Sequence, residues 1–378
     1  MKYNLQLAAL FLLASVAMAA QESAPRVYRS GNEWIEESTG TLTAIKSLRV
    51  KTSAGSIQIQ GNPQNTITYV VRKRMRASSE ENARREFARL RVSASNTPEG
   101  SVIRGEGEHY SKCSIDFDIR VPNPISSVKL ETTGGAVTAT NIQGPVEAAT
   151  GGGVIHLDQI GAGVSATSGG GDIEIGKVGG DVYVQTGGGG IRIGSAGGKI
   201  VAMSGGGTLI IGSGQAMTLQ TGGGSIQVDK CTGAVKASTG GGTVNLNEVT
   251  GHAQVSSGGG SIKVVHVAGG LRAETGSGPI IADLSAGHGT FTESRLETAA
   301  GDIIVYIPDD LAITIRAAVD VAHGAGISSE FPGLKISANG QQWGPRELWA
   351  EGSLNGGGPV LHVHAITGSI TLKRKEKK

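Results

Sequence analysis

The sequence predicts an all-β protein: a parallel β-solenoid of the β-helix or β-roll type, with about 18 residues in each rung and a small N-terminal α+β cap. Three observations predict this fold. A Thr or Ser followed by glycines recurs at a nearly constant spacing, apolar and polar residues alternate between these marks, and aromatic residues make up only 4% of a chain with 61 glycines. Strands this short cannot bury their apolar side chains alone, so we expect them to stack.

The repeat is marked by a hydroxyl residue that precedes each glycine run. The gaps between successive marks are 17 or 18 residues, and self-similarity at such a period indicates a solenoid in which each repeat is one rung. The nine marks are Thr133, Thr150, Ser168, Thr186, Ser204, Thr221, Thr239, Ser257 and Thr275.

Each repeat contains two short strands separated by a second glycine corner. Ile226 and Val228 follow one glycine run, and Val235 and Ala237 follow the single corner glycine Gly233. Period-two alternation is typical of half-buried strands, and glycine tolerates tight corners. Stacking at about 4.8 Å predicts nine to eleven rungs in a rod about 45–50 Å long, and we expect a right-handed solenoid because parallel crossovers usually are.

The N-terminal residues resemble an export signal. Lys2 precedes an apolar stretch over residues 5–16, and an Ala-Met-Ala site ends at Ala19, so residues 1–20 are predicted to be a cleaved signal peptide. We therefore expect an exported protein in the periplasm, at the cell surface or outside the cell, with no transmembrane segment in the mature chain. Residues 21–40 are predicted to be a flexible segment.

The other divisions follow from changes in the pattern. Residues 41–131 are predicted to be the strand and helix cap, residues 132–323 the repeats, residues 324–372 a loop-rich end with the last strands, and residues 373–378 a basic tail. In the cap, Ser78 and Glu81 form a possible capping box, and Ala83 and Phe87 recur at helical spacing. A helix there would shield the end of the stack from edge-to-edge growth.

Composition and motifs favour a non-enzymatic protein. A net charge of +2 does not suggest a nucleic-acid partner. Cys113 and Cys231 are expected to be unpaired, and a disulfide between them is the alternative. No nucleophile elbow or phosphate-binding loop is complete, so we expect no catalytic residues, no cofactor and no metal. The oligomeric state cannot be inferred from the sequence.

Four segments resemble a known family. They are LRVKTSAGSIQIQG, FDIRVP leading into VKLETTGGAVTATNIQG, the glycine ladder, and the run from RLETAAGDIIVYIP to LHVHAITGSITL. Over residues 42–373 the chain resembles the bacterial putative-adhesin family and is similar to the domain of auto-transporter adhesins called head-GIN. The resemblance implies a β-solenoid in an exported protein, and it supplies no catalytic residues.

Several residue groups are candidate sites, each with a structural alternative. The hydroxyl column could bind glycan or ice, or it could bond the backbone at the corners. Arg72 and Arg74 could bind anionic envelope polymers or belong to a charge-balanced face, and Trp343 and Trp349 could stack on sugars or plug the rod.

A further pair, His362 and His364, would share one strand face, where two imidazoles can chelate a metal. The structural alternative is plain strand alternation, because Leu361 and Val363 lie on the other face.

These features predict an exported, non-enzymatic adhesin that binds glycan, envelope polymer or protein at the cell surface. A periplasmic envelope scaffold or stress accessory is one alternative, and a polysaccharide lyase or hydrolase built on a β-helix is another. An enzyme of that kind would carry its acidic and basic groups on loops that project from the rungs, and such loops are nearly absent here.

Overall fold

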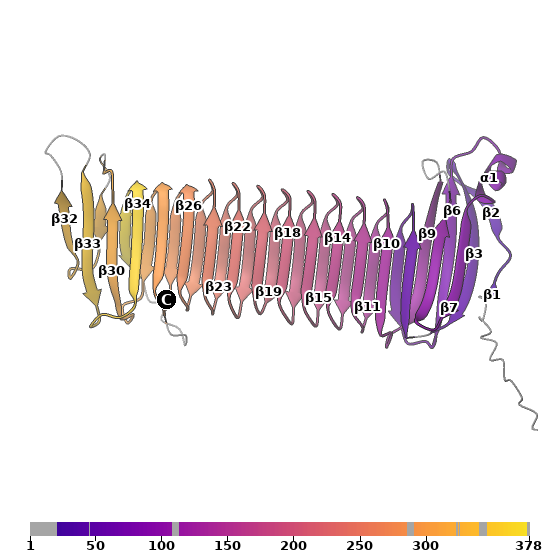
Figure 1. Cartoon of the computed structure of the whole chain (residues 1–378), viewed down its shortest axis with the longest axis horizontal. Coiled ribbons are helices and arrows are strands. Elements are labelled where there is room, and N and C mark those ends of the chain that lie inside the picture. The colour runs from indigo at the N-terminus through magenta and orange to yellow at the C-terminus, as the bar shows by residue number, and fades with distance from the viewer. Residues whose placement is uncertain are drawn as a thin grey trace, which may run out of the picture.

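The computed structural model describes residues 21–44, 46–107, 113–285, 291–322, 324, 326–339 and 346–375. The expected signal peptide in residues 1–20 and the candidate residue Trp343 lie outside this set. Within it, the chain forms a long rod made of two facing sheets, A and B, which contain 17 and 18 strands (Figure 1). The predicted all-β solenoid is confirmed.

Sheet A contains β4 (Ser47–Thr52), β7 (Arg91–Thr97), β8 (Gly100–Glu106), β10 (Ser127–Thr132), β12 (Val146–Thr150), β14 (Val164–Ser168), β16 (Val182–Thr186), β18 (Ile200–Ser204), β20 (Met217–Thr221), β22 (Val235–Thr239), β24 (Ala253–Ser257), β26 (Leu271–Ser277), β28 (Ser294–Ala300), β30 (Ile313–Val319), β32 (Lys335–Asn339), β33 (Glu347–Leu354) and β34 (Val360–Thr367).

Sheet B contains β1 (Gln21–Glu22), β2 (Arg26–Ser30), β3 (Glu33–Thr43), β5 (Ile57–Asn62), β6 (Thr66–Met75), β9 (Cys113–Pro122), β11 (Val137–Ile142), β13 (Ile155–Ile160), β15 (Ile173–Val178), β17 (Ile191–Ala196), β19 (Leu209–Gly214), β21 (Ile226–Cys231), β23 (Val244–Val249), β25 (Ile262–Val267), β27 (Ile280–Leu284), β29 (Ile303–Ile307), β31 (Ile327–Ser329) and β35 (Ile370–Arg374).

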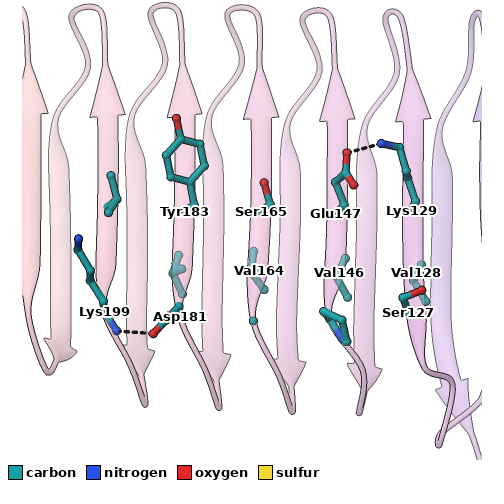
Figure 2. A pocket seen from close by; sticks show the side chains of 14 residues that line it. Ser127, Val128, Lys129, Val146, Glu147, Val164, Ser165, Asp181, Tyr183 and Lys199 are labelled. Carbon is teal, nitrogen blue, oxygen red and sulfur yellow. Dashed lines mark hydrogen bonds and ion pairs between the residues drawn. The ribbon is translucent and has the colours of Figure 1, made fainter.

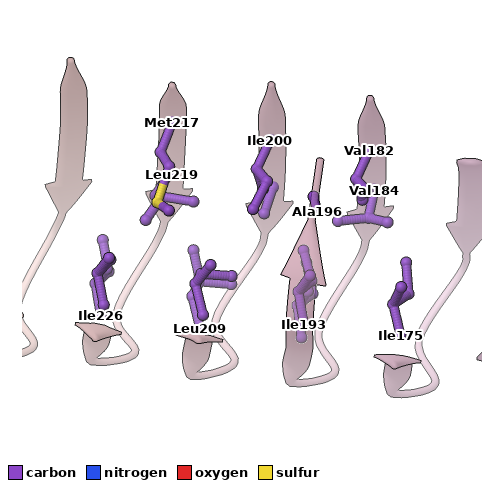
Figure 3. Close-up of a cluster of buried hydrophobic side chains, with 14 of the residues drawn as sticks. Ile175, Val182, Val184, Ile193, Ala196, Ile200, Leu209, Met217, Leu219 and Ile226 are labelled. Atoms are coloured by element: carbon purple, nitrogen blue, oxygen red, sulfur yellow. The ribbon is translucent and has the colours of Figure 1, made fainter. Parts of the chain in front are cut away.

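Each rung gives one strand to each sheet, and neighbouring rungs pair in parallel. Val164 pairs with Val182 and Val182 with Ile200, which is a step of 18 residues, whereas Ile200 pairs with Met217 after 17. The alternating apolar residues therefore form columns that fill the space between the sheets (Figure 3). The labelled columns include Val182, Ile200 and Met217 of sheet A and Ile193 and Leu209 of sheet B, each no more than 2% exposed.

The hydroxyl column lies inside the rod and bonds the backbone. The Ser168 hydroxyl donates to the Gly153 carbonyl of the preceding rung at 2.9 Å and accepts from Gly171 N–H of its own rung at 2.9 Å. The same donation to the preceding rung recurs from Thr132 to Thr298, and these residues are at most 7% exposed. The column thus has the corner-bonding role, and its hydroxyls are not available to a ligand.

The first member of the column differs from the sequence prediction. Thr132, not Thr133, is buried, donates to the Gly55 carbonyl at 2.8 Å and accepts from Gly135 N–H at 3.3 Å. Thr133 is exposed. The physical reason is strand parity: the next inward position after Val128 and Leu130 is Thr132, which restores a regular step to Thr150.

The N-terminal end is more ordered than predicted. Residues 26–30 and 33–43, expected to be mostly flexible, form β2 and β3, and β3 pairs along its length with β6. Two segments of the expected cap are rungs of the stack, because β4 and β5 pair in parallel with β10 and β11 on one side and with β8 and β9 on the other.

The single helix in the described residues, α1 (Glu80–Phe87), covers this end and buries Ala83 and Phe87. Its N-cap is Ser79 and not the predicted Ser78, because the Ser79 hydroxyl accepts from Asn82 N–H at 3.3 Å. At its other end the Lys73 ammonium donates to the Phe87 carbonyl at 3.2 Å. A cation at a helix C-terminus is stabilising because the last carbonyls carry partial negative charge.

The C-terminal end also contains more strands than predicted. The stretch expected to be rich in loops forms β31, β32 and β33, of which β33 pairs antiparallel with both β30 and β32. The last strands, β34 and β35, enter the stack between β28–β29 and β30–β31.

The parallel stack is therefore longer than the repeats alone. In sheet A it runs β8, β4, β10, then the even strands to β28, then β34 and β30, which makes fourteen rungs, not nine to eleven. Thirteen spacings of about 4.8 Å give a rod of about 62 Å. No helix in the described residues is long and apolar enough to cross a membrane. Cys113 and Cys231 are buried and are not joined by a disulfide.

Candidate binding face

The outer face of sheet A carries two continuous rows of side chains. Because the strands pair without a slip, outward residues of successive rungs stand side by side along the rod. The Tyr183 row is Lys129, Glu147, Ser165, Tyr183, Val201, Thr218, Lys236, Gln254, Arg272, Arg295, His362, Arg316 and Glu351. The Trp349 row beside it is Glu131, Ala149, Thr167, Gln185, Met203, Gln220, Ser238, Ser256, Glu274, Glu297, His364, Ala318 and Trp349.

A groove of about 620 Å³ crosses β10 to β18 on this face. Figure 2 shows Tyr183 standing out from β16 beside Ser165 and Glu147. The Tyr183 side chain is 42% exposed, and its hydroxyl lies 3.5 Å from Gln185 Oε1. At the lower edge, Asp181 accepts from Lys199 N–H at 2.8 Å, which ties the two corners together. The groove therefore offers an aromatic surface with polar groups beside it.

Charged residues flank this groove on its N-terminal side. Lys129 pairs with Glu147 and with Glu131, and Arg49 pairs with Glu131 at 3.2 Å. Burial acts to raise the pKa of Glu131, but hydrogen bonds from Lys129 and Arg49 outweigh it and hold that pKa below the ordinary value. The hydrogen bond to Glu147 raises the pKa of Lys129. Both shifts favour the charged forms of Lys129 and Glu131, which pair with each other.

A second hollow, of about 410 Å³, lies around Trp349 near the C-terminal end of the same face. Three neighbours in the Trp349 row line it: Ala318 lies between Trp349 and His364. Arg316 and His362 border it from the Tyr183 row. Trp349 is 41% exposed, so the indole is accessible and does not plug the rod.

Ion pairs surround the Trp349 hollow. Arg295 pairs with Glu297 at 3.1 Å and Arg316 with Glu351 at 3.0 Å. His364 Nε2 lies 2.9 Å from Asp320 Oδ1. The hollow therefore combines an exposed indole with donors and acceptors held in place by their partners.

The two histidines stand in the Tyr183 and Trp349 rows, as their predicted shared face requires. His362 Nε2 lies 3.6 Å from a carboxylate oxygen of Glu293, and His364 contacts Asp320. Within the described residues, no group of three or more His, Cys, Asp or Glu side chains is gathered as a metal would need.

The arginines selected from the sequence lie elsewhere, on the outer face of sheet B at the N-terminal end. Arg72 pairs with Glu37 at 2.8 Å, and this hydrogen bond raises the pKa of Arg72. Arg74 forms an ion pair with Asp116 at 2.9 Å. The structure thus does not bring Arg72 and Arg74 together with Trp349, and their role in binding stays a prediction.

Sequence reasoning did not select Tyr183. Its signal was nevertheless present, because Tyr183 is the only Phe, Trp or Tyr between Phe117 and Phe291. It also occupies an outward position of the alternation, between the inward residues Val182 and Val184. An aromatic side chain there is not needed by the core.

Comparisons with known proteins give only distant likenesses. No protein-family model matches the chain, and no curated protein matches it. Three solved bacterial structures resemble it. One, from Clostridium sporogenes and described as a putative cell adhesion protein, is 8% identical, with 94% of this chain and 100% of that chain covered and a TM-score of 0.18.

The other two are described as putative adhesins. The protein from Bacteroides fragilis is 14% identical over 61% of this chain and 94% of its own, with a TM-score of 0.31. The protein from Parabacteroides distasonis is 11% identical over 72% of this chain and 94% of its own, with a TM-score of 0.28. Likenesses at this level carry no weight for function, so the functional argument rests on the residues of this chain.

Proposed function

We propose that this chain is an exported, non-enzymatic adhesin that binds a long glycan or envelope polymer along the outer face of sheet A. The observation that supports it is the continuity of the Tyr183 and Trp349 rows, each with one exposed aromatic residue beside a hollow. A rigid repeated surface suits an extended partner because each rung adds a small, similar contribution.

The spacing of the two aromatics favours a polymer over a small molecule. From Tyr183 on β16 the sheet continues through β18, β20, β22, β24, β26, β28, β34 and β30 to Trp349 on β33. These nine spacings at about 4.8 Å separate the two side chains by roughly 43 Å. Only an extended chain reaches both at once.

The chemistry of the central rungs favours an uncharged polymer. Aromatic rings with a polar tip present a flat apolar surface on which the faces of sugar rings can lie. The outward residues from β14 to β20 carry no charge. They are Ser165, Thr167, Tyr183, Gln185, Val201, Met203, Thr218 and Gln220.

Substitution of the two aromatics tests the proposal. Immobilised protein is titrated with dextran, mannan and hyaluronan, and with oligosaccharides of increasing length. Tyr183→Ala and Trp349→Ala are each expected to weaken binding of the long polymer about tenfold, which corresponds to about 1.4 kcal/mol. The double variant is expected to lose more than either, and short oligosaccharides are expected to bind weakly throughout.

A matched control exists on the opposite face. Tyr306 lies on β29 of sheet B and is partly buried, so Tyr306→Ala removes an aromatic side chain without touching either row of sheet A. It is expected to leave binding unchanged. Binding to no polysaccharide, or equal losses in Tyr306→Ala and Trp349→Ala, would refute the proposed face.

Two further measurements address the other parts of the proposal. Polymer recovered after long incubation with the protein is expected to keep its length, and shortening would indicate a lyase or hydrolase. Protease treatment of intact host cells is expected to remove the protein while periplasmic markers survive. Protection in intact cells, with release by osmotic shock, would instead indicate a periplasmic scaffold.

A further inference from the structure

The C-terminal end of sheet A finishes in an exposed edge strand. β32 pairs antiparallel with β33, and no other described residue pairs with it. All five of its residues, Lys335–Asn339, are exposed. Figure 1 shows β32 as the last strand at the end of the rod opposite α1. Its outer edge presents backbone donors and acceptors that can pair with another strand.

The inner face of this edge is apolar and only partly covered. Ile336 pairs with Ala350, which is 1% exposed, so both point toward the inside of the rod. Ile336 is nevertheless 49% exposed. Sheet B ends with the three-residue strand β31, so sheet A extends beyond the layer that would cover Ile336.

At the N-terminal end the edge strands are partly covered: within the part of the chain that the structure describes, β7 pairs only with β8 and β2 only with β3, but neither is exposed along its whole length. There β3 is flanked by β1 and β2, and α1 packs onto the end of the core. On sheet A, the Asn96 side chain of β7 donates to the Thr43 carbonyl, which ties that edge to the end of β3. The two ends of the rod are therefore unlike, and only the C-terminal end has a strand exposed along its whole length in the described residues.

We propose that β32 pairs antiparallel with β32 of a second copy of this chain, which joins two rods at their C-terminal ends. The register follows from the five-residue strand. With Ser337 at the two-fold axis, Lys335 faces the partner's Asn339 and Ile336 faces the partner's Ala338. No like charges oppose one another, and two half-covered apolar residues meet on the inner face.

The charges of β33 support the same register. Lys335 already lies beside Glu351 of its own chain, and Asn339 beside Glu347. Across the axis, Lys335 would lie two strand spacings from the partner's Glu347, with the uncharged Asn339 of the partner subunit between them, so each lysine stands between two carboxylates. A two-fold contact of this kind is closed, and it yields a dimer and not a growing filament.

The contact is expected to be weak and reversible. Stable dimers bury about 1,200–2,000 Å² in total, which is more than a pair of five-residue strands supplies. The dimer places two Trp349 side chains on one continuous face, three strand spacings or about 14 Å apart. The inference does not rest on polymer binding, because pairing of β32 requires no ligand.

Cysteine trapping tests the register directly. In the proposed dimer the two Ser337 Cα atoms are about 4.5–5.5 Å apart, within the range of a disulfide. The two Lys335 Cα atoms, four residues out of register, are about 13 Å apart. Mild oxidation of the full-length protein is expected to convert Ser337→Cys to a covalent dimer and to leave Lys335→Cys a monomer. The native thiols, Cys113 and Cys231, are 8% and 0% exposed, so the unsubstituted protein gives the background.

Sedimentation equilibrium provides the second test. The unsubstituted protein and Ser337→Thr are expected to show a dimer fraction that rises with concentration. Ser337→Glu is expected to remain monomeric, because it places two carboxylates directly opposite each other at the axis. Ser337→Glu should keep its unfolding midpoint, and all these measurements are made without polysaccharide, so their outcome does not depend on the polymer-binding proposal.

Three outcomes would overturn the proposal. The first is equal oxidation of Ser337→Cys and Lys335→Cys, which indicates random collision. The second is a monomer at every concentration together with no Ser337→Cys dimer. The third is a mass above that of a dimer, which indicates an open, head-to-tail contact.

Discussion

Neighbouring glycines of one corner are predicted to differ sharply in their tolerance of a methyl group. In the Ser168 rung, a Cβ on Gly170 would meet no atom within 4 Å. A Cβ on Gly171 would lie 2.5 Å from the Gly153 carbonyl carbon and 2.8 Å from the Gly152 oxygen, and closer still to the Gly153 oxygen. Gly171→Ala must therefore push two rungs apart.

The magnitude follows from this geometry. Overpacking against atoms that cannot move aside costs about 1–3 kcal/mol. Separation of the rungs also strains the bond from the Ser168 hydroxyl to the Gly153 carbonyl, now 2.9 Å. Gly170→Ala meets no obstacle and reduces the freedom of the unfolded chain, which stabilises by about 0.4–1 kcal/mol. The two variants should differ in free energy of unfolding by about 1.4–4 kcal/mol.

Urea unfolding followed by circular dichroism measures the difference. We expect Gly170→Ala to unfold at the same or a higher urea concentration than the unsubstituted protein, and Gly171→Ala at a clearly lower one. Gly169→Ala is a second destabilising variant and should behave like Gly171→Ala, because a Cβ there also meets the backbone of the preceding rung, at Gly151. A Gly171→Ala midpoint equal to that of Gly170→Ala would refute the close-packed corner.

Three further predictions concern buried polar groups. Thr239→Val removes a hydroxyl that donates to the Gly224 carbonyl at 2.7 Å and is expected to cost about 1–3 kcal/mol, with Thr239→Ser as the milder control in urea unfolding. Lys73→Met leaves the Glu36 carboxylate, 17% exposed and 2.7 Å from the ammonium, without its partner. The substitution is expected to lower the free energy of unfolding by about 3 kcal/mol, and most of this loss should be recovered when Glu36→Leu is added. Thermal unfolding measures both changes. Burial raises the pKa of Tyr69 and of Cys231 above their ordinary values of 10.0 and 9.0. A pKa that is raised in the folded state stabilises the folded protein below the pKa of the unfolded state, and this stabilisation is lost as pH rises. The urea concentration at the midpoint of unfolding should therefore fall above about pH 9, and the fall should be less steep in Tyr69→Phe.

The repeat region was predictable because one local pattern is reinforced by every neighbouring rung. The alternation that places Val182 and Val184 inside also places Thr186 inside, and the glycine run fixes the corner. The one misplaced member, Thr133, arose because two threonines precede that glycine run. Counting inward positions from Val128 would have selected Thr132.

The two ends were less predictable because their pairings are non-local. β34 lies between β28 and β30, although it follows β30 in sequence. Similarly, β4 separates β8 from β10. No periodicity within one segment reveals which rung it will join. The mixed polar sequence of β3 reads as flexible until its charges, such as Glu37, are matched with those of β6.

The same physics explains why the candidate binding residues were harder to find than the core. An inward position must hold a small or branched apolar residue or a bonded hydroxyl, so its identity follows from the fold. At an outward position of a parallel sheet, the backbone hydrogen bonds form whatever the side chain is. The fold therefore does not constrain the identity of the residue. A binding residue is therefore visible in the sequence only as an outlier, as Tyr183 is among outward residues that are otherwise small, aliphatic or hydrophilic. Trp349 stands out for the same reason, because its neighbours across the sheet are Ala318 and Ser337. Removal of these two aromatics should thus weaken binding strongly while leaving the unfolding midpoint unchanged, whereas an inward substitution is expected to lower the unfolding midpoint.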